Sequence, residues 1–212
     1  MAITFQNAVQ AVINTTPSAF DCGTGSNRFL IVGVLKQSSQ STTGVTYNGV
    51  SMTKVATVAT NSDVSTNEET TLWVLANPAS GSNNIALSFS GAGTFGFAAA
   101  CYNGVDQTTT TRNPNTEHSP TSAAHSVSVA TTVGDWVIGF SRTNGASTAD
   151  GNTTYRGGAS TNITIMDSGS AIGSSPYAIG HSDSESDNLL ATGVIPFGTT
   201  VINNLSLLGV GT

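Results

Sequence analysis

The sequence predicts an all-β fold, an antiparallel β-sandwich of jelly-roll type. Short runs of apolar or alternating residues recur along the whole chain, and segments rich in Gly, Asn, Asp, Ser and Pro separate them. No window of a dozen residues holds an amphipathic helical period. The runs follow one another at roughly 10 to 15 residues without helical crossovers, which is typical of antiparallel strands in a sandwich.

Eleven segments are expected to contain strands. In chain order they are 28–37, a hairpin at 45–59, 69–77, 84–90, 94–103, 125–131, 134–143, 161–168, 175–183, 189–195 and 199–208. The hairpin is indicated by Asn48-Gly49 between two alternating runs, because both central residues of a type I′ turn need positive φ. Asn tolerates such a φ and Gly adopts it freely, so a two-residue turn is predicted here.

The hydrophobic patterns also predict how these strands are buried. Within 84–90, Ile85, Leu87 and Phe89 alternate with Ala86 and Ser88, so one face is expected to be buried. Residues 29–35 and 95–101 are apolar on both faces, which indicates central strands covered on both sides. Trp73 and Trp136 lie inside apolar runs and are predicted to be core residues. The polar segment 106–126 is predicted to be a long connection across one end of the fold.

The chain has the length of one all-β domain, and no linker or fixed-period repeat divides its 212 residues. We expect a β-sandwich domain over 17–212, preceded by an N-terminal strand or arm over 1–16 that contributes to assembly. The first residues lack the positive and apolar regions of a Sec signal. No run approaches the length of apolar sequence that a transmembrane helix needs.

Composition argues against nucleic-acid and membrane-surface binding. Charged residues make up 8% of the chain, and the net charge is −6. The six basic residues are scattered singly, so they form no stripe that could neutralise several phosphates or bind an anionic membrane. The chain contains 32 Thr and 27 Ser, which predicts a weakly charged surface hydrated by hydroxyl groups.

Four stretches carry a resemblance to a known module. They are "NRFLIVGVL", "VTYNGVSMTKV", "TLWVLANPASGSNNIALSFSG" and "AACYNGVDQTT", which together span 27 to about 110. This order resembles a β-sandwich module of bacteriophage virion and bacterial surface proteins. The resemblance implies a scaffold with a role in a virion or in adhesion, and it covers roughly half of the chain.

Two groups of residues are candidate sites. Tyr155 and Arg156, in the Gly-rich segment "NTTYRGG", are an aromatic and a hydrogen-bonding side chain that could bind a sugar; a single surface Tyr is the simpler interpretation. Asp183, Glu185 and Asp187 alternate in "HSDSESDN", so their carboxylates would share one face of an extended strand. Calcium suits such oxygen clusters. The spacing is not that of an EF-hand, and a solvated acidic loop is the alternative.

Nothing in the sequence identifies a catalytic site. The three histidines, His118, His125 and His181, lack the spacing of a zinc motif, although ligands from different strands could still meet. Glu68 and Glu69 are adjacent and would point to opposite faces of a strand, and Glu117 falls in the expected connection. No nucleophile elbow or phosphate-binding loop is present.

Cys22 and Cys101 are the only cysteines, and the sequence leaves open whether they are paired. Cys101 lies in the apolar run "FGFAAACY", where a buried free thiol is the simpler interpretation. Cys22, in a Gly-rich loop, stays unassigned.

The function expected from these observations is structural and non-enzymatic. We expect a virion protein, made in the host cytoplasm, that decorates a capsid or forms part of a tail or fibre. Its partners would be other virion proteins and further copies of itself, and it would need no cofactor. The alternative is a carbohydrate-binding or host-adhesion module at a cell surface. A polysaccharide-degrading enzyme is the third possibility.

Overall fold

The computed structural model describes residues 1–11, 14, 19–37, 40–60, 68–119, 124–142, 147–157, 163–182 and 187–198. Within these ranges the chain forms antiparallel strands and no helix, which confirms the predicted all-β class. The jelly-roll type stays a prediction.

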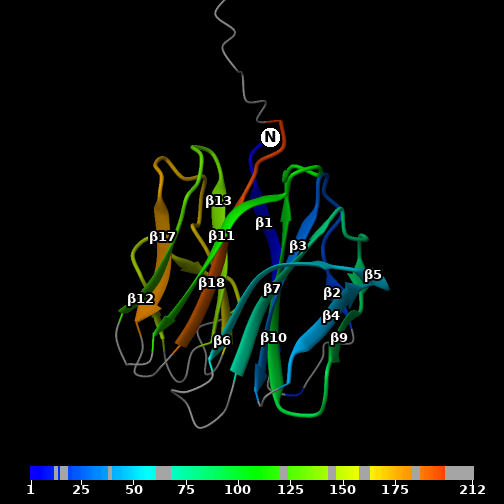
Figure 1. Cartoon of the computed structure of the whole chain (residues 1–212). Helices are drawn as coiled ribbons and strands as arrows, with labels where there is room; N and C mark the ends of the chain where they lie inside the picture. The colour runs from blue at the N-terminus through cyan, green and yellow to red at the C-terminus, as the bar shows by residue number, and fades with distance from the viewer. Residues whose placement is uncertain are drawn as a thin grey trace, which may run out of the picture.

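The strands form four layers, seen edge-on from left to right in Figure 1. The two middle layers are five-stranded sheets. The first inner sheet has the order β1 (Thr4–Ala11), β10 (Phe95–Asn103), β3 (Phe29–Gln37), β7 (Glu68–Ala76) and β6 (Thr53–Thr60). The second inner sheet has the order β11 (Thr111–Ser119), β18 (Asp187–Val194), β13 (Trp136–Arg142), β16 (Ile163–Asp167) and β15 (Thr154–Tyr155).

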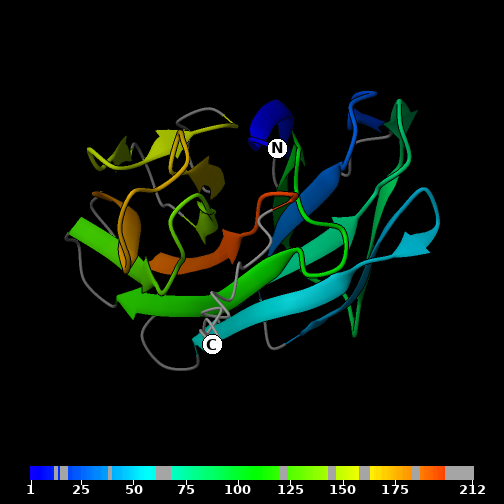
Figure 2. The same cartoon turned by 90° about the horizontal axis from the view of Figure 1, so that it is seen from above.

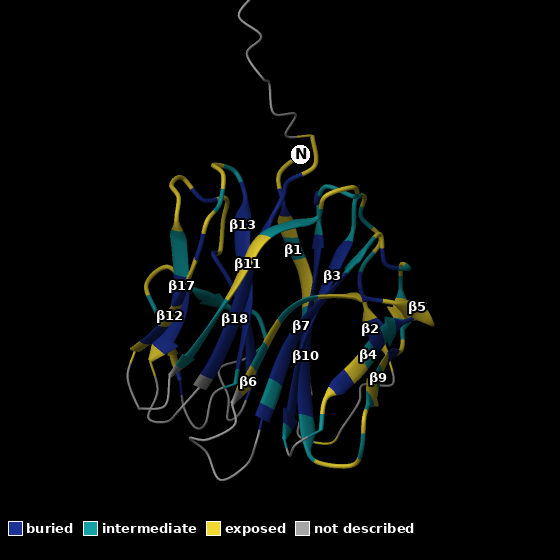
Figure 3. Cartoon of the chain, in the orientation of Figure 1, coloured by how far each residue is buried: buried dark blue, intermediate teal, exposed yellow. Residues whose placement is uncertain are grey.

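Smaller sheets cover the outer faces of these two. The first outer layer contains β5 (Val50–Ser51), β4 (Thr42–Tyr47) and β9 (Ile85–Phe89), with the short pair β2 (Phe20–Asp21) and β8 (Ser82–Asn83). The second outer layer contains β12 (Ala124–Val129), β17 (Tyr177–Ser182) and β14 (Thr148–Ala149). The central strands of each inner sheet, such as β3 and β13, are therefore buried on both faces and dark blue in Figure 3, whereas the edge strands β1, β6 and β11 are partly exposed.

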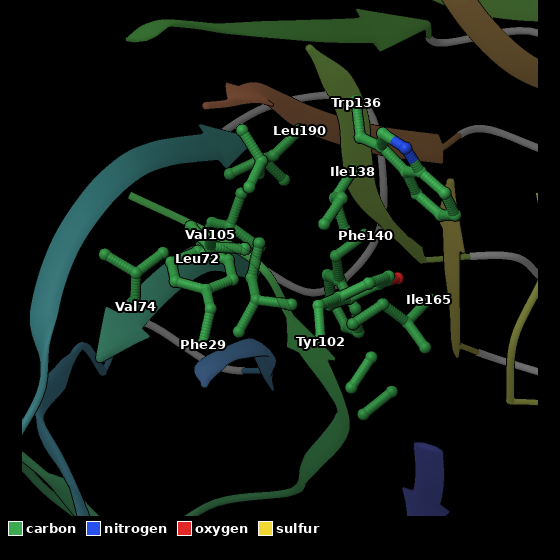
Figure 4. Close-up of a cluster of buried hydrophobic side chains, with 14 of the residues drawn as sticks. Phe29, Leu72, Val74, Tyr102, Val105, Trp136, Ile138, Phe140, Ile165 and Leu190 are labelled. Atoms are coloured by element: carbon green, nitrogen blue, oxygen red, sulfur yellow. The ribbon is translucent and has the colours of Figure 1, made fainter. Parts of the chain in front are cut away.

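Three hydrophobic clusters fill the spaces between the layers. The central core lies between the two inner sheets and includes Phe29, Leu72, Tyr102, Phe140 and Ile165, drawn in Figure 4. The first flank core packs the first inner sheet against the first outer layer, and the second flank core does the same for the second pair. At the centre of the molecule Gly33 of β3 lies against Phe140, where an added Cβ would come within 2.0 Å of Phe140 Cγ.

The second half of the chain repeats the strand pairing of the first. In each half the first strand pairs with the last strand, and the last strand also pairs with a central strand. The central strand pairs on its other side with a fourth strand. The fourth strand pairs in turn with the strand that comes directly before it in the sequence. The orders β1-β10-β3-β7-β6 and β11-β18-β13-β16-β15 thus correspond position by position. The sequence has no fixed period that would indicate this repetition, because it lies in the hydrogen-bonding order.

The two inner sheets pack face to face with their strand orders running in opposite directions. The first strand of each half therefore lies near the opposite end of the strand order in the other half's sheet. β1 lies near β16, and β11 lies along β6, as Figure 2 shows from above. The segments that follow the last strands also meet, because Val105 and Pro196 form an antiparallel bridge. These contacts make one block from the two halves.

Several sequence predictions are confirmed in detail. Asn48 and Gly49 have φ values of 50° and 76° and join β4 to β5, as the predicted turn requires. Of the predicted segments 29–35 and 95–101, all residues are buried except the half-buried Phe95, and β3 and β10 are both interior strands of their sheet. Trp73 and Trp136 are core residues. Residues 4–11 of the N-terminal segment form a strand, and the predicted strand at 199–208 lies outside the described residues.

The interpretation of 106–126 as one long connection is wrong. Residues 111–119 form β11, which pairs with β18, and Ala124 begins β12. The segment has no apolar alternation because β11 is an edge strand. Pro114 is compatible with an edge, since it needs no ladder hydrogen bond there, and a bulge between Arg112 and Asn115 shifts the register.

Candidate functional site

Tyr155 and Arg156, the sequence-predicted ligand pair, lie at the edge of the second inner sheet. Tyr155 is in β15 rather than in a loop, and its half-buried ring packs against the second flank core. Its hydroxyl donates a hydrogen bond to Ser147 Oγ at 3.0 Å. A role of this pair in ligand binding stays a prediction, but both side chains already serve internal contacts.

Arg156 is the cation of a buried ion pair. Its Nε lies 2.7 Å from Oδ2 of Asp167, whose side chain is fully buried at the end of β16. The guanidinium also lies over the ring of Phe5, 4.5 Å from the centroid, and 5.9 Å from that of Trp136. Phe5 belongs to the first inner sheet and Trp136 to the second, so Arg156 connects the two sheets.

Asp167 collects three hydrogen-bond donors in this position. Tyr102 donates its hydroxyl to Oδ2 at 2.8 Å, and the backbone N–H of Gly169 donates to Oδ1 at 2.8 Å. Burial, and then the nearby Asp167 carboxylate, raise the pKa of Tyr102 well above its usual value of 10.0, while Arg156 lowers it. Tyr102 therefore stays a neutral donor, and the group links β10 to β16 across the central core.

The candidate calcium ligands fall mostly outside the described part of the chain. This applies to Asp183 and Glu185, whereas Asp187 is the first residue of β18, without a described side chain. Across the described residues, no group of three or more His, Cys, Asp or Glu side chains could hold a metal ion. Calcium binding by the acidic run stays a prediction.

The structure brings together residues of a polar cluster that the sequence separates. His125 of β12 and His181 of β17 are cross-strand partners with ring centroids 5.7 Å apart. Nε2 of His181 lies 2.7 Å from Ser141 Oγ on β13, and Glu117 Oε2 of β11 lies 3.9 Å from His125 Nδ1. We call Glu117, His125, Ser141 and His181 the histidine cluster; it lies at the end of the second flank core.

A Ser–His hydrogen bond is the arrangement of an activated nucleophile, so its exposure is decisive. Ser141 and His181 are both fully buried, and His125 is buried too. Ser141 Oγ also hydrogen-bonds the backbone oxygens of Arg142 and Asn188, at 2.9 and 3.2 Å. The Ser141 hydroxyl is thus directed toward the main chain. Its hydrogen bonds to His181 and to the backbone of Asn188 connect β13 with β17 and β18.

A second polar group lies on the opposite face of β13 and β18, between the inner sheets. Glu68 of β7 pairs with Arg142 of β13 at 3.1 Å, and its neighbour Glu69 faces the other side, where it accepts a hydrogen bond from the Thr42 N–H. The two glutamates therefore point to opposite faces, as predicted. His118 Nδ1 lies 2.9 Å from Asn188 Oδ1, and Asn188 donates to Thr70 Oγ1 of β7.

Glu117 was expected in a loop and instead occupies β11, which is why its approach to His125 could not be foreseen. No local signal identifies these clusters, because each joins residues from three or more strands. The one indication that the sequence offers is a histidine at an inward position of an alternating strand whose other inward residues are valines, as His125 is in β12.

Cys22 and Cys101 form a disulfide bond, with their Cα atoms 5.3 Å apart. The interpretation of Cys101 as a free thiol is therefore wrong, although its burial was predicted. Both residues belong to the first flank core. The bond joins the loop after β2 to β10, a pairing that the sequence could not give because 79 positions separate the two residues.

Lys36 is a buried lysine of β3 whose Nζ has no hydrogen-bond partner among the described atoms. The ammonium group lies 5.1 Å from the centroid of the Phe89 ring. Burial lowers the pKa of Lys36 from its usual 10.5, because the charged form loses hydration. This side chain thus costs stability in its charged form.

We expect Lys36→Met to raise the free energy of unfolding at pH 7 by about 1 kcal/mol, since it removes a buried charge and preserves volume. The folded protein releases this proton at a lower pH than the unfolded chain. The wild-type free energy of unfolding therefore increases as the pH rises from the lowered pKa to 10.5. Over this range the difference in unfolding free energy between Lys36→Met and the wild type becomes smaller. Urea unfolding at pH 7 and pH 10 measures both effects.

Lys54→Met is the matched control, because exposed Lys54 also lies over an aromatic ring, 5.2 Å from the Trp73 centroid. Its effect should stay within about 0.5 kcal/mol. A Lys36→Met variant that is less stable than the wild type at pH 7 would contradict the assignment of Lys36 as a destabilising charge.

No family model, no curated protein and no solved structure matches the chain. In the described ranges, no helix is long and apolar enough to cross a membrane.

Proposed function

We propose that the protein is a non-enzymatic structural subunit of a larger assembly, with a virion component that decorates a capsid or builds a tail or fibre as the specific form. The polar chemistry supports this proposal, because Arg156, Asp167 and the histidine cluster are turned inward and connect layers of the fold. The resemblance of residues 27–110 to modules of virion and surface proteins also supports a structural role.

The observation that carries the proposal is the placement of exposed apolar side chains. Of the four large hydrophobic side chains that are exposed in the described ranges, three are Met1, Val133 and Phe197. The Met1 amino group donates to the Phe197 carbonyl oxygen. Gly134, next to Val133, would place a Cβ 4.0 Å from Pro196. Met1 is thus in contact with Phe197, and the loop that carries Val133 lies beside Pro196; we call Met1, Val133 and Phe197 the apolar end.

Exposed apolar residues that gather at one place are typical of contact surfaces, whereas single ones are normal on any protein. We assign the apolar end to contacts with neighbouring subunits. The buried disulfide supports a working environment outside the reducing cytosol, such as a released virion or a cell surface.

The double substitution Val133→Asp/Phe197→Asp tests this function. We expect the wild-type chain to self-associate and the variant to dissociate at least about tenfold more readily, which corresponds to about 1.4 kcal/mol. Sedimentation velocity over a concentration series measures the difference. Val50→Asp is the matched control, because Val50 is the fourth exposed hydrophobic and lies on β5, in the first outer layer.

Equal sedimentation of all three proteins would contradict the assignment of the apolar end. Saturable binding of host glycans by a chain that stays monomeric would instead favour the adhesion alternative.

A further inference from the structure

The tetrapeptide Tyr-Asn-Gly-Val occurs twice in the chain, at 47–50 and at 102–105. Asparagine is a thermolabile residue, and it is most reactive before glycine, because glycine has no side chain that would keep its backbone nitrogen away from the asparagine amide. Identical neighbours give Asn48 and Asn103 the same intrinsic reactivity. Any difference between the two asparagines in the native protein must therefore come from the fold.

Asn48 lies in an open position at the tip of the β4–β5 hairpin, at the outer rim of the molecule (Figure 1). Asn48 and Gly49 are both exposed, and a Cβ added at Gly49 would have no atom within 4 Å, so water reaches the turn. The Asn48 N–H donates to Asn84 O at 3.0 Å. Among the described residues, no backbone oxygen accepts the Gly49 N–H.

The hairpin that holds Asn48 is short. To react, the backbone must leave the turn conformation, in which Asn48 has a φ of 50°, so that the Gly49 nitrogen reaches Cγ of Asn48. Only two exposed residues form β5, and they pair with Thr46 and Tyr47. Opening so short and exposed a ladder costs much less free energy than global unfolding. The turn can therefore open while the core stays folded.

Asn103 has the opposite environment. It is the last residue of the interior strand β10 and pairs with Thr4 of β1. Gly104 is buried, and its N–H donates to Ser26 O at 3.2 Å. A Cβ added at Gly25 would collide with Nδ2 of Asn103, so the amide is enclosed by the chain. Moving the Gly104 nitrogen toward the Asn103 side chain would disrupt the sheet itself.

We propose that Asn48 is a site of spontaneous deamidation in the folded protein, and that the fold protects Asn103. The Gly49 backbone nitrogen attacks Cγ of Asn48 and loses its proton to water, while the bond from Cγ to Nδ2 breaks and ammonia leaves. The five-membered succinimide ring that results takes up one water at either carbonyl carbon and opens to aspartate or isoaspartate. Water is the only co-reactant, and the exposed turn supplies it.

The modification changes the first outer layer and is independent of the proposed assembly. Each event adds one carboxylate to a chain whose net charge is −6. Isoaspartate also adds one atom to the main chain, so a two-residue turn no longer fits the pairing of Tyr47 with Val50. β4 keeps its place, because it also pairs with β9 and because the Tyr47 hydroxyl donates to Phe20 O at 2.9 Å.

Peptide mapping of the native protein, incubated at mildly alkaline pH, tests the proposal. Mass spectrometry with an isoaspartate-specific assay should find that Asn48 is modified at least about tenfold faster than Asn103. A parallel sample in denaturant is the matched control. There the two identical tetrapeptides should react at equal rates, which would show that the fold causes the difference. Asn144-Gly145, outside the described residues, is followed separately by its own peptide.

The variant Asn48→Gln gives a second readout. Attack on the longer side chain would have to close a six-membered ring, which forms far more slowly, so the peptide with position 48 should stay unmodified in native and denatured samples alike. Native Asn48 that reacts no faster than native Asn103, while both react in denaturant, would overturn the proposal, because the turn would then protect its asparagine as well as the sheet does.

Discussion

Replacing Asp167 with alanine is expected to lower the free energy of unfolding by about 3 to 5 kcal/mol, the cost of removing one partner of a buried ion pair. The Arg156 guanidinium would lose its carboxylate, and the fully buried Tyr102 hydroxyl would lose its acceptor. Both groups lie between the inner sheets, so the two halves of the molecule would be held together less strongly. Urea unfolding at neutral pH measures the change.

A second variant distinguishes the ion pair from simple loss of volume. Asp167→Leu combined with Arg156→Met replaces both charges by apolar groups and should recover at least about 1 kcal/mol relative to Asp167→Ala. Asp21→Ala is the control: Asp21 is exposed and accepts one hydrogen bond, from the Gly23 N–H at 2.7 Å, so it should cost about 1 kcal/mol or less. Equal losses for Asp167→Ala and Asp21→Ala would show that the Asp167 group does not join the halves.

Removing the disulfide should have an effect of similar size. Cys22 and Cys101 are 79 positions apart and close a long loop, and constraining such a loop in the unfolded chain is worth about 4.5 kcal/mol in the chain-entropy model. Cys22→Ala/Cys101→Ala should therefore lower the free energy of unfolding by about that amount. The fold should persist, because both positions lie in a large apolar core.

Reduction of the wild-type protein provides the matching measurement. With a strong reductant under denaturing conditions, the wild type should become as unstable as the double alanine variant, and the variant should not respond. Two reactive thiols in the denatured, unreduced protein would contradict the pairing of Cys22 with Cys101.

The sequence predicts those parts of the fold that depend on local rules. The Asn48-Gly49 turn, the alternating strand at 85–89 and the two-sided burial of β3 and β10 each follow from residues that are close in the chain. β11 escaped prediction because its pairing with β18, about 75 positions later, and not its own pattern, makes it a strand.

The internal polar groups depend on tertiary pairing and could not be predicted. Arg156 was a candidate ligand residue, and its ion pair with Asp167 arises because the neighbouring strand of the same sheet places that carboxylate against it. His125 and His181 meet because β12 and β17 pair in one particular register. The same strand order in both halves is equally hidden, since the turns and loops differ in length and sequence.

We propose above that this protein is a structural subunit that assembles through its apolar end. Electron microscopy of the purified wild-type chain, at the concentrations where it sediments as oligomers, is the decisive experiment. We expect regular assemblies in which the end that carries the exposed Met1, Val133 and Phe197 is buried between neighbouring copies. Single, separate molecules at every concentration, or assemblies that leave this end exposed to solvent, would contradict it.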